Sequence, residues 1–277
     1  MGTIPNKTFK PRAEIGTIDM GLDICMGSYE GISGINKFGR NIEIDSGVTA
    51  DIWDGGHTVA SGGVSLIWVA PTQARVHNIV SSSTSDDGDP VGVGARTIQI
   101  YGLTSWDSEE VSEVITMNGT SNVATTNSYV IIYRMKVLTK GATSANVGII
   151  KATAVTDNTI TAQIRAGQGQ TQMAIYAIPS TQKLYIGRLY ANCNKAAGNA
   201  ALMDTSLLVN PEPDAELTNF ITKHTFGLQT VGTSAFTIPY YIPKLIEGPA
   251  IVKVQCLSGT NDMDVSAGFD AVVVNNS

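Results

Sequence analysis

One pattern occurs twice in this sequence. WVAPTQARVHNIV lies in the first half and YAIPSTQKLYIGR in the second. In each, an apolar segment meets a proline and a short polar turn, and a second apolar segment follows. The offset between the two halves grows only from 108 residues at Pro71 and Pro179 to 113 residues at Gly119 and Gly232. A slowly drifting offset with segment order preserved indicates a duplicated domain, although chance similarity between β-rich segments would give a weaker version of the same pattern.

Short strands separated by turn signals fill both halves. In ARTIQIYGL, apolar Ile98 and Ile100 alternate with polar side chains, which is the period of a strand. Asn118-Gly119 predicts a tight hairpin turn between two long strands, and Asp157-Asn158 predicts another turn. With 28 glycines, and 15% charged residues against about 25% in average proteins, the composition favours β structure. The sequence predicts an all-β chain with two tandem jelly-roll-like β-sandwich domains, at 51–166 and 167–277.

Residues 1–50 show neither a helical nor a strand period, and a glycine recurs every few residues. The segment nevertheless holds too many apolar side chains for a solvated tail. Its first twelve residues carry a charge of +3 on a chain of net charge −6. We therefore expect an extended N-terminal arm that contacts another surface, with plain disorder as the alternative. The expected assembly contacts are Phe9, Lys10, Arg12, Phe38 and Arg40.

Charge and cysteine usage exclude several classes of protein. A net charge of −6 disfavours binding to nucleic acid. Cys25, Cys193 and Cys256 are odd in number and scattered, which predicts neither disulfides nor a zinc site and fits synthesis in a reducing cytoplasm. No secretory leader and no apolar run of about 18 residues is present, so we expect no membrane partner.

Catalytic motifs are weak or incomplete. The three histidines, His57, His77 and His224, lack metal-ligand spacing. GVGART and GQGQTQ begin like phosphate loops but lack the third glycine. SDDGDP (residues 85–90) clusters acids without the alternation of a calcium loop, and DSEEVSE (residues 107–113) would serve a glycosidase only if two acids faced each other across a cleft. The sequence therefore predicts no enzyme, no cofactor and no metal.

A set of segments resembles a known group. KFGRNIEID, DIWDGG, GARTIQIYGL, VSEVITMNGT, SYVIIYRMKVL, GQTQMAIYAIPSTQKLY and VSAGFDAVVV, in this order from about residue 35 to the end, resemble virion structural proteins that are widespread among tailed marine bacteriophages. The resemblance implies a structural role in the capsid or tail and carries no catalytic residues. The first 35 residues lie outside it.

Together these features predict a virion protein assembled in the host cytoplasm. We expect a homo-oligomer, with a trimer favoured, that decorates and cements the capsid by binding the major capsid protein or other virion proteins. Two alternatives stay open: a neck, tail or baseplate component, and a host-surface carbohydrate-binding module that would expose tryptophan or tyrosine on a concave face.

Overall fold

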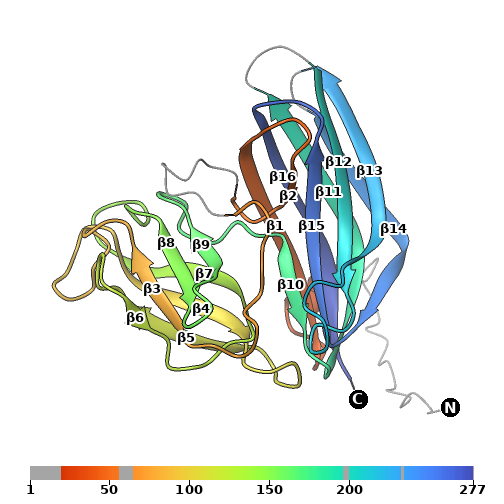
Figure 1. Cartoon of the computed structure of the whole chain (residues 1–277). Coiled ribbons are helices and arrows are strands. Elements are labelled where there is room, and N and C mark those ends of the chain that lie inside the picture. Colours follow the sequence, from red (N-terminus) through yellow and green to blue (C-terminus); the bar gives the residue numbers. More distant parts are fainter. Residues whose placement is uncertain (1–19, 56–64, 196–199, 232–233, 277) are drawn as a thin grey trace, which may run out of the picture.

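The computed structural model describes residues 20–55, 65–195, 200–231 and 234–276. Within these ranges the chain is all-β, with sixteen strands and one six-residue helix, α1 (Met20–Cys25). Figure 1 shows two lobes. We call the smaller one, made of β3–β9, the insert lobe, and the larger one, made of β1, β2 and β10–β16, the main lobe.

The main lobe contains two sheets. One has the strand order β1-β16-β11-β14, and the other has the order β10-β15-β12-β13 with β2 also paired to β15. All of these pairs are antiparallel. The strands span Ile32–Ile44 (β1), Thr49–Asp51 (β2), Ile175–Ile178 (β10), Gln182–Lys195 (β11), Ala200–Asn210 (β12), Ile221–Val231 (β13), Ser234–Glu247 (β14), Ala250–Ser258 (β15) and Met263–Asn275 (β16).

The insert lobe also contains two antiparallel sheets, with the orders β6-β3-β8-β9 and β5-β4-β7. Its strands span His77–Ser81 (β3), Ala95–Leu103 (β4), Val111–Thr116 (β5), Val123–Ala124 (β6), Ile131–Lys140 (β7), Ile150–Ala154 (β8) and Ile160–Ile164 (β9). The buried apolar side chains of both lobes belong to one connected core.

The two lobes share one pairing scheme. When β3–β8 are matched in order with β11–β16, the row β6-β3-β8 corresponds to β14-β11-β16, and β5-β4-β7 corresponds to β13-β12-β15. The remaining strands differ. β15 also pairs with β10 and β2, which have no counterpart beside β7, and the strand beside β8 or β16 differs in origin. It is β9, which follows β8 in the insert lobe, and β1, which comes from the N-terminal side in the main lobe. The repeated sequence pattern thus lies at equivalent places, with Pro71 before β3 and Pro179 before β11.

The expected arm differs from the structure over residues 32–51. β1 pairs with β16 along most of its length, and β2 pairs with β15. The insert lobe therefore interrupts the main lobe between β2 and β10 instead of preceding it in tandem. One of the recurring glycines, Gly39, permits close packing within β1. A Cβ on Gly39 would lie 2.7 Å from the Gln172 carbonyl oxygen and 2.8 Å from the backbone nitrogen of Ala174.

Two of the expected turns have different outcomes. Asp157 and Asn158 do connect the paired strands β8 and β9, with Asn158 at a φ of 55°. Asn118-Gly119 does not close a hairpin, because β5 and β6 belong to different sheets. It carries the chain from one sheet to the other, and Asn118 forms a single bridge with Asp87.

Candidate assembly surfaces

The predicted contact residues fall into two groups. Phe9, Lys10 and Arg12 lie outside the described residues. Phe38 and Arg40 lie in β1, so they belong to a paired strand of the main lobe and not to an arm. Phe38 is 38% exposed, whereas Arg40 is half-buried and its carbonyl accepts a hydrogen bond of 2.7 Å from the Asp54 amide.

Phe38 lines a cavity of about 210 Å³ at the junction of the lobes. Beside it, the Lys37 ammonium donates a 2.7 Å hydrogen bond to the Tyr133 carbonyl of β7 and lies 5.4 Å from the Tyr133 ring. Burial, together with the nearby Arg134, lowers the pKa of Lys37 to about 7. Sequence analysis missed this lysine because its partner is about a hundred residues away in sequence.

The acidic loop SDDGDP does not present its acids together. Asp86 is fully buried, and its two carboxylate oxygens accept four hydrogen bonds. The donors are the Ser81 hydroxyl at 2.6 Å and the amides of Ala95, Val147 and Gly148, each at 2.8 Å. The carboxylate thus ties together the starts of β4 and β8 and the end of β3, and no lone pair faces a cation.

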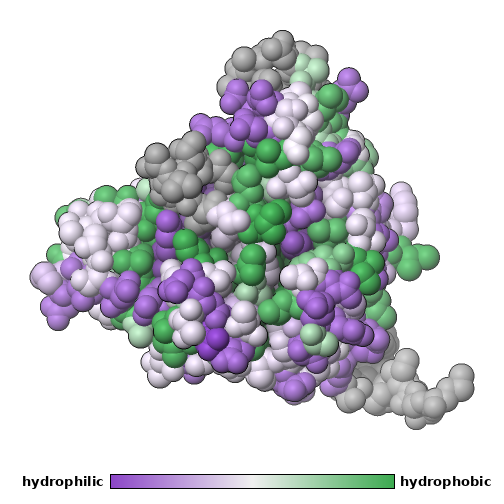
Figure 2. Space-filling view, in the orientation of Figure 1, coloured by the Kyte–Doolittle hydropathy of each residue, from purple (hydrophilic) through white to green (hydrophobic). Residues whose placement is uncertain are grey.

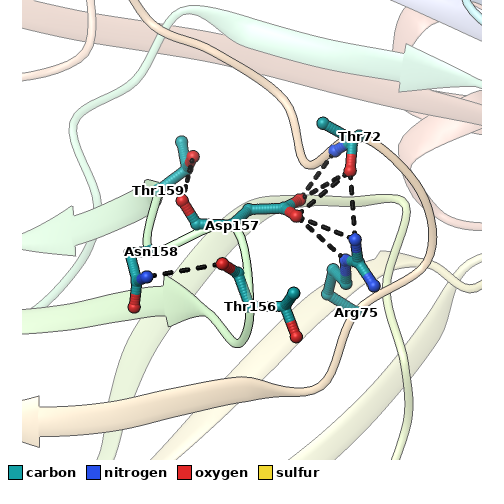
Figure 3. Close-up of polar contacts among 6 residues, drawn as sticks. All are labelled: Thr72, Arg75, Thr156, Asp157, Asn158 and Thr159. Atoms are coloured by element: carbon teal, nitrogen blue, oxygen red, sulfur yellow. Dashed lines mark hydrogen bonds and ion pairs between the residues drawn. The ribbon is translucent and has the colours of Figure 1, made fainter.

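Asp157 plays a similar part at the opposite end of the insert lobe (Figure 3). Its carboxylate accepts bonds from the amide and hydroxyl of Thr72 and from the Nε of Arg75, and Arg75 Nη2 lies 2.9 Å away. The hydrogen bond from the Thr72 amide, followed by the one from Arg75, lowers the pKa of Asp157. The repeated proline turn is therefore held by the β8–β9 turn.

A buried ion pair joins the strands of the main lobe. Lys253 Nζ lies 2.8 Å from Asp51 Oδ2, and both side chains are almost wholly buried. The Trp68 amide and the Gln255 side chain also donate to Asp51, and the Phe220 ring covers Lys253 at 4.1 Å. The pair fixes β2 and the chain entering the insert lobe to β15.

The histidines are placed as packing residues. His77 is fully buried, and burial lowers its pKa to about 4. Its Nδ1 contacts the Arg75 carbonyl at 2.9 Å. His224 is half-buried against the rings of Phe226 and Tyr240, and His57 lies outside the described residues. Among the described residues no three side chains of histidine, cysteine, aspartate or glutamate are grouped as metal ligands.

The acids of DSEEVSE diverge. Asp107 accepts a 2.7 Å bond from the Ser180 hydroxyl, Glu110 accepts one from the Tyr133 hydroxyl, and Glu113 accepts bonds from the amides of residues 126 and 127. Asp107, Glu110 and Glu113 thus each have a different partner. No helix of the described ranges is long and apolar enough to cross a membrane.

The two most exposed large apolar side chains of the described residues lie on one flank of the main lobe, together with three others. β13 and β14 are the edge strands of their sheets. In β14 the register with β11 shifts so that Tyr240–Pro243 stand opposite Gly187 alone. Tyr241 and Ile242 are 97% and 86% exposed, and Figure 2 shows hydrophobic side chains standing out where β14 lies in Figure 1. We call this surface the ridge; its exposed apolar members are Ile221, Phe236, Tyr241, Ile242 and Leu245.

A second apolar surface lies between the lobes. A groove of about 620 Å³ has a floor and walls from both lobes and an acidic rim at the β12–β13 connection. Trp106, Val69 and Leu217 supply apolar surface, and Asp214 and Glu216 are exposed at the rim. The sequence alone could not place Trp106 beside residues 213–218, which are more than a hundred positions away.

Comparison with known proteins gives little. No family model matches the chain, and no curated protein matches it. Among solved structures, the infectious bursal disease virus Gt strain gives 11% identity and a TM-score of 0.18, covering 93% of this chain and 78% of that one. The Gx strain gives 10% identity and a TM-score of 0.23, covering 89% of this chain and 71% of that one. A VP2 subviral particle of the same virus gives 9% identity and a TM-score of 0.18, covering 91% of this chain and 77% of that one. TM-scores this low do not establish a shared fold.

Proposed function

We propose that this chain is a non-enzymatic structural protein of a tailed-phage virion, one that decorates and cements the capsid by binding the major capsid protein and other copies of itself. The observation that carries the proposal is the exposed apolar ridge on a two-lobed β scaffold. Tyr241 and Ile242 present large apolar side chains to solvent, and such surfaces mark contacts with other proteins. The segments that resemble phage virion proteins point the same way.

The scaffold suits a structural role. Asp51, Asp86 and Asp157 each hold loops or strands together through several hydrogen bonds, so these acids act in architecture. We further infer that each lobe is a jelly roll and that the two arose by duplication, because six strands pair in the same order in both lobes. The jelly roll is a common architecture of capsid proteins.

Heating of particles tests the cement role. Virions assembled without the protein should release DNA at a lower temperature than complete virions, and adding the purified protein back should restore the release temperature. Equal release temperatures would refute cementing. Counting copies per particle then separates decoration, which needs hundreds, from a neck, tail or baseplate role, which needs on the order of six to a few dozen.

One observation favours a carbohydrate-binding alternative. Tyr241 is exposed next to a ring cluster of His224, Phe226, Phe236 and Tyr240, and aromatic faces can stack on sugars. A glycan array probed with the wild-type chain and with Tyr241→Ser decides this alternative. Binding that depends on Tyr241 would support it, and an array without signal would remove it.

A further inference from the structure

The ridge is built for side-chain docking and not for strand addition. A long edge strand normally invites pairing with another chain. β14 blocks such pairing with Pro239, Pro243 and the four-residue bulge between its two paired segments, since proline donates no hydrogen bond and a bulge breaks the ladder. What remains available is the protruding pair Tyr241 and Ile242.

The surroundings of this pair are cationic. Within β13 and β14 the charged side chains are Lys223, Lys244 and Glu247, and Glu247 is already paired with Lys183 at 2.9 Å. Lys244 lies 4.9 Å from the Tyr240 ring, at the base of the protruding pair. The ridge therefore combines an exposed apolar pair with the positive charge of Lys244, on a chain whose net charge is −6.

The interlobe groove has the complementary character. Its walls are apolar, with Trp106, Val69 and Leu217, and its rim carries Asp214 and Glu216. Its volume of about 620 Å³ exceeds what one tyrosine and one isoleucine side chain need. Tyr241 and Ile242 do not line the groove, so a contact between this pair and the groove joins two different surfaces of the chain.

We propose that the ridge of one copy docks into the interlobe groove of a second copy, with Tyr241 and Ile242 in the groove and Lys244 facing Asp214 and Glu216. Such a head-to-tail contact builds a closed ring when its rotation closes. The two protruding side chains offer on the order of 350 Å². This is about a third of the roughly 1,000 Å² that a specific interface buries, so the surfaces around the ridge and the groove supply the remainder. The proposal concerns self-assembly and does not require the virion role.

Sedimentation equilibrium of the full-length chain, from about 1 to 100 μM, tests this contact. We expect concentration-dependent association of the wild type. The variant Y241S/I242S should associate at least about thirtyfold more weakly than the wild type, because central apolar anchors dominate interfaces. L138S, which truncates an exposed apolar side chain on β7, is the matched control and should associate like the wild type. Circular dichroism and thermal unfolding check that each variant is folded.

Charge reversal tests the specific pairing. Lys244→Glu alone and Asp214→Lys alone should each weaken association about tenfold, because each places like charges together. The double variant, and an equimolar mixture of the two single variants, should recover association. Lys140→Glu, at an exposed lysine on β7, controls for net charge.

Three results would overturn the proposal. A wild type that stays monomeric at 100 μM has no such contact, whether or not Tyr241 then binds a sugar or an unrelated protein. Association that Asp214→Lys leaves unchanged would place the ridge against another surface. A double variant no better than either single variant would deny that Lys244 and Asp214 face each other. None of these results bears on particle heat resistance, so the virion proposal fails or stands separately.

Discussion

Replacing Asp86 should unfold the insert lobe at much lower denaturant concentration than the wild type requires. In Asp86→Ala, four buried donors lose their acceptor: the Ser81 hydroxyl and the amides of Ala95, Val147 and Gly148. Each buried donor left without a partner costs about 1–3 kcal/mol, and these costs do not add fully. We expect a loss of about 4 kcal/mol, a large part of the 5–15 kcal/mol that typically stabilises a domain.

Two further substitutions provide the comparison for Asp86→Ala. Asp86→Asn keeps one oxygen and turns an amide NH₂ toward the donors of the other, so we expect roughly half the loss of the alanine variant. Asp87→Asn is the neighbouring control, since within the described residues the Asp87 carboxylate accepts a single hydrogen bond, from the Asp89 amide at 3.0 Å, and it should change stability by less than about 0.5 kcal/mol. Urea unfolding followed by tryptophan fluorescence and circular dichroism gives the free energies. An Asp86→Ala variant within about 1 kcal/mol of the wild type would refute the idea that this carboxylate anchors the loop.

Three further perturbations have clear expected outcomes. Lys253→Met leaves the Asp51 carboxylate buried without its cation and should cost about 3–5 kcal/mol in urea unfolding; a loss under 1 kcal/mol would contradict this. His77 has its folded-state pKa lowered from 6.5 to about 4 by burial, so the unfolded chain binds the extra proton between these values. The free energy of unfolding is therefore unaffected by His77 titration above pH 6.5, and it falls by up to about 3 kcal/mol as the pH drops to 4. The stability lost on acidification should be smaller in His77→Gln than in the wild type, and equal losses would count against the assignment. Gly39→Ala places a Cβ against backbone atoms at 2.7–2.8 Å and should lower the midpoint of thermal unfolding by several degrees, whereas Gly34→Ala, whose nearest neighbours would lie 3.9 Å away, should cost far less; equal shifts would contradict the close-packing argument.

The repeat was visible in the sequence because strand alternation and proline turns are local signals. Pro71 and Pro179 precede strands that occupy equivalent places, β3 and β11. The interruption of the main lobe was not visible, since nothing local in residues 32–51 indicates that their partners lie more than two hundred residues later. Gly39 gave no sign that it lies within a strand, because a glycine that permits close packing and a glycine that ends a strand look alike in sequence.

The candidate surfaces were predicted less well than the fold. Phe38 and Arg40 were assigned to an extended arm because residues 1–50 show no strand period, and they lie instead in β1, where Phe38 lines the cavity at the lobe junction. The ridge carried a recognisable signal in Tyr240-Tyr241, two adjacent tyrosines in a strand interrupted by prolines. Its exposure could not be derived locally, because it depends on the register of β14 against β11.

The different origin of the closing strands has a consequence for how the two lobes form. In the insert lobe, β9 follows β8 directly and closes the sheet within one continuous segment. In the main lobe, β16 pairs with β1 and β15 with β2, so those pairs join residues more than two hundred positions apart. Contacts of such separation form slowly, because the chain entropy of closing the loop is lost first. Folding the insert lobe early brings its two ends together and shortens the effective loop between β2 and β10. The insertion thus supports the assembly of the lobe that it interrupts, and the Asp51–Lys253 pair lies where that closure is completed.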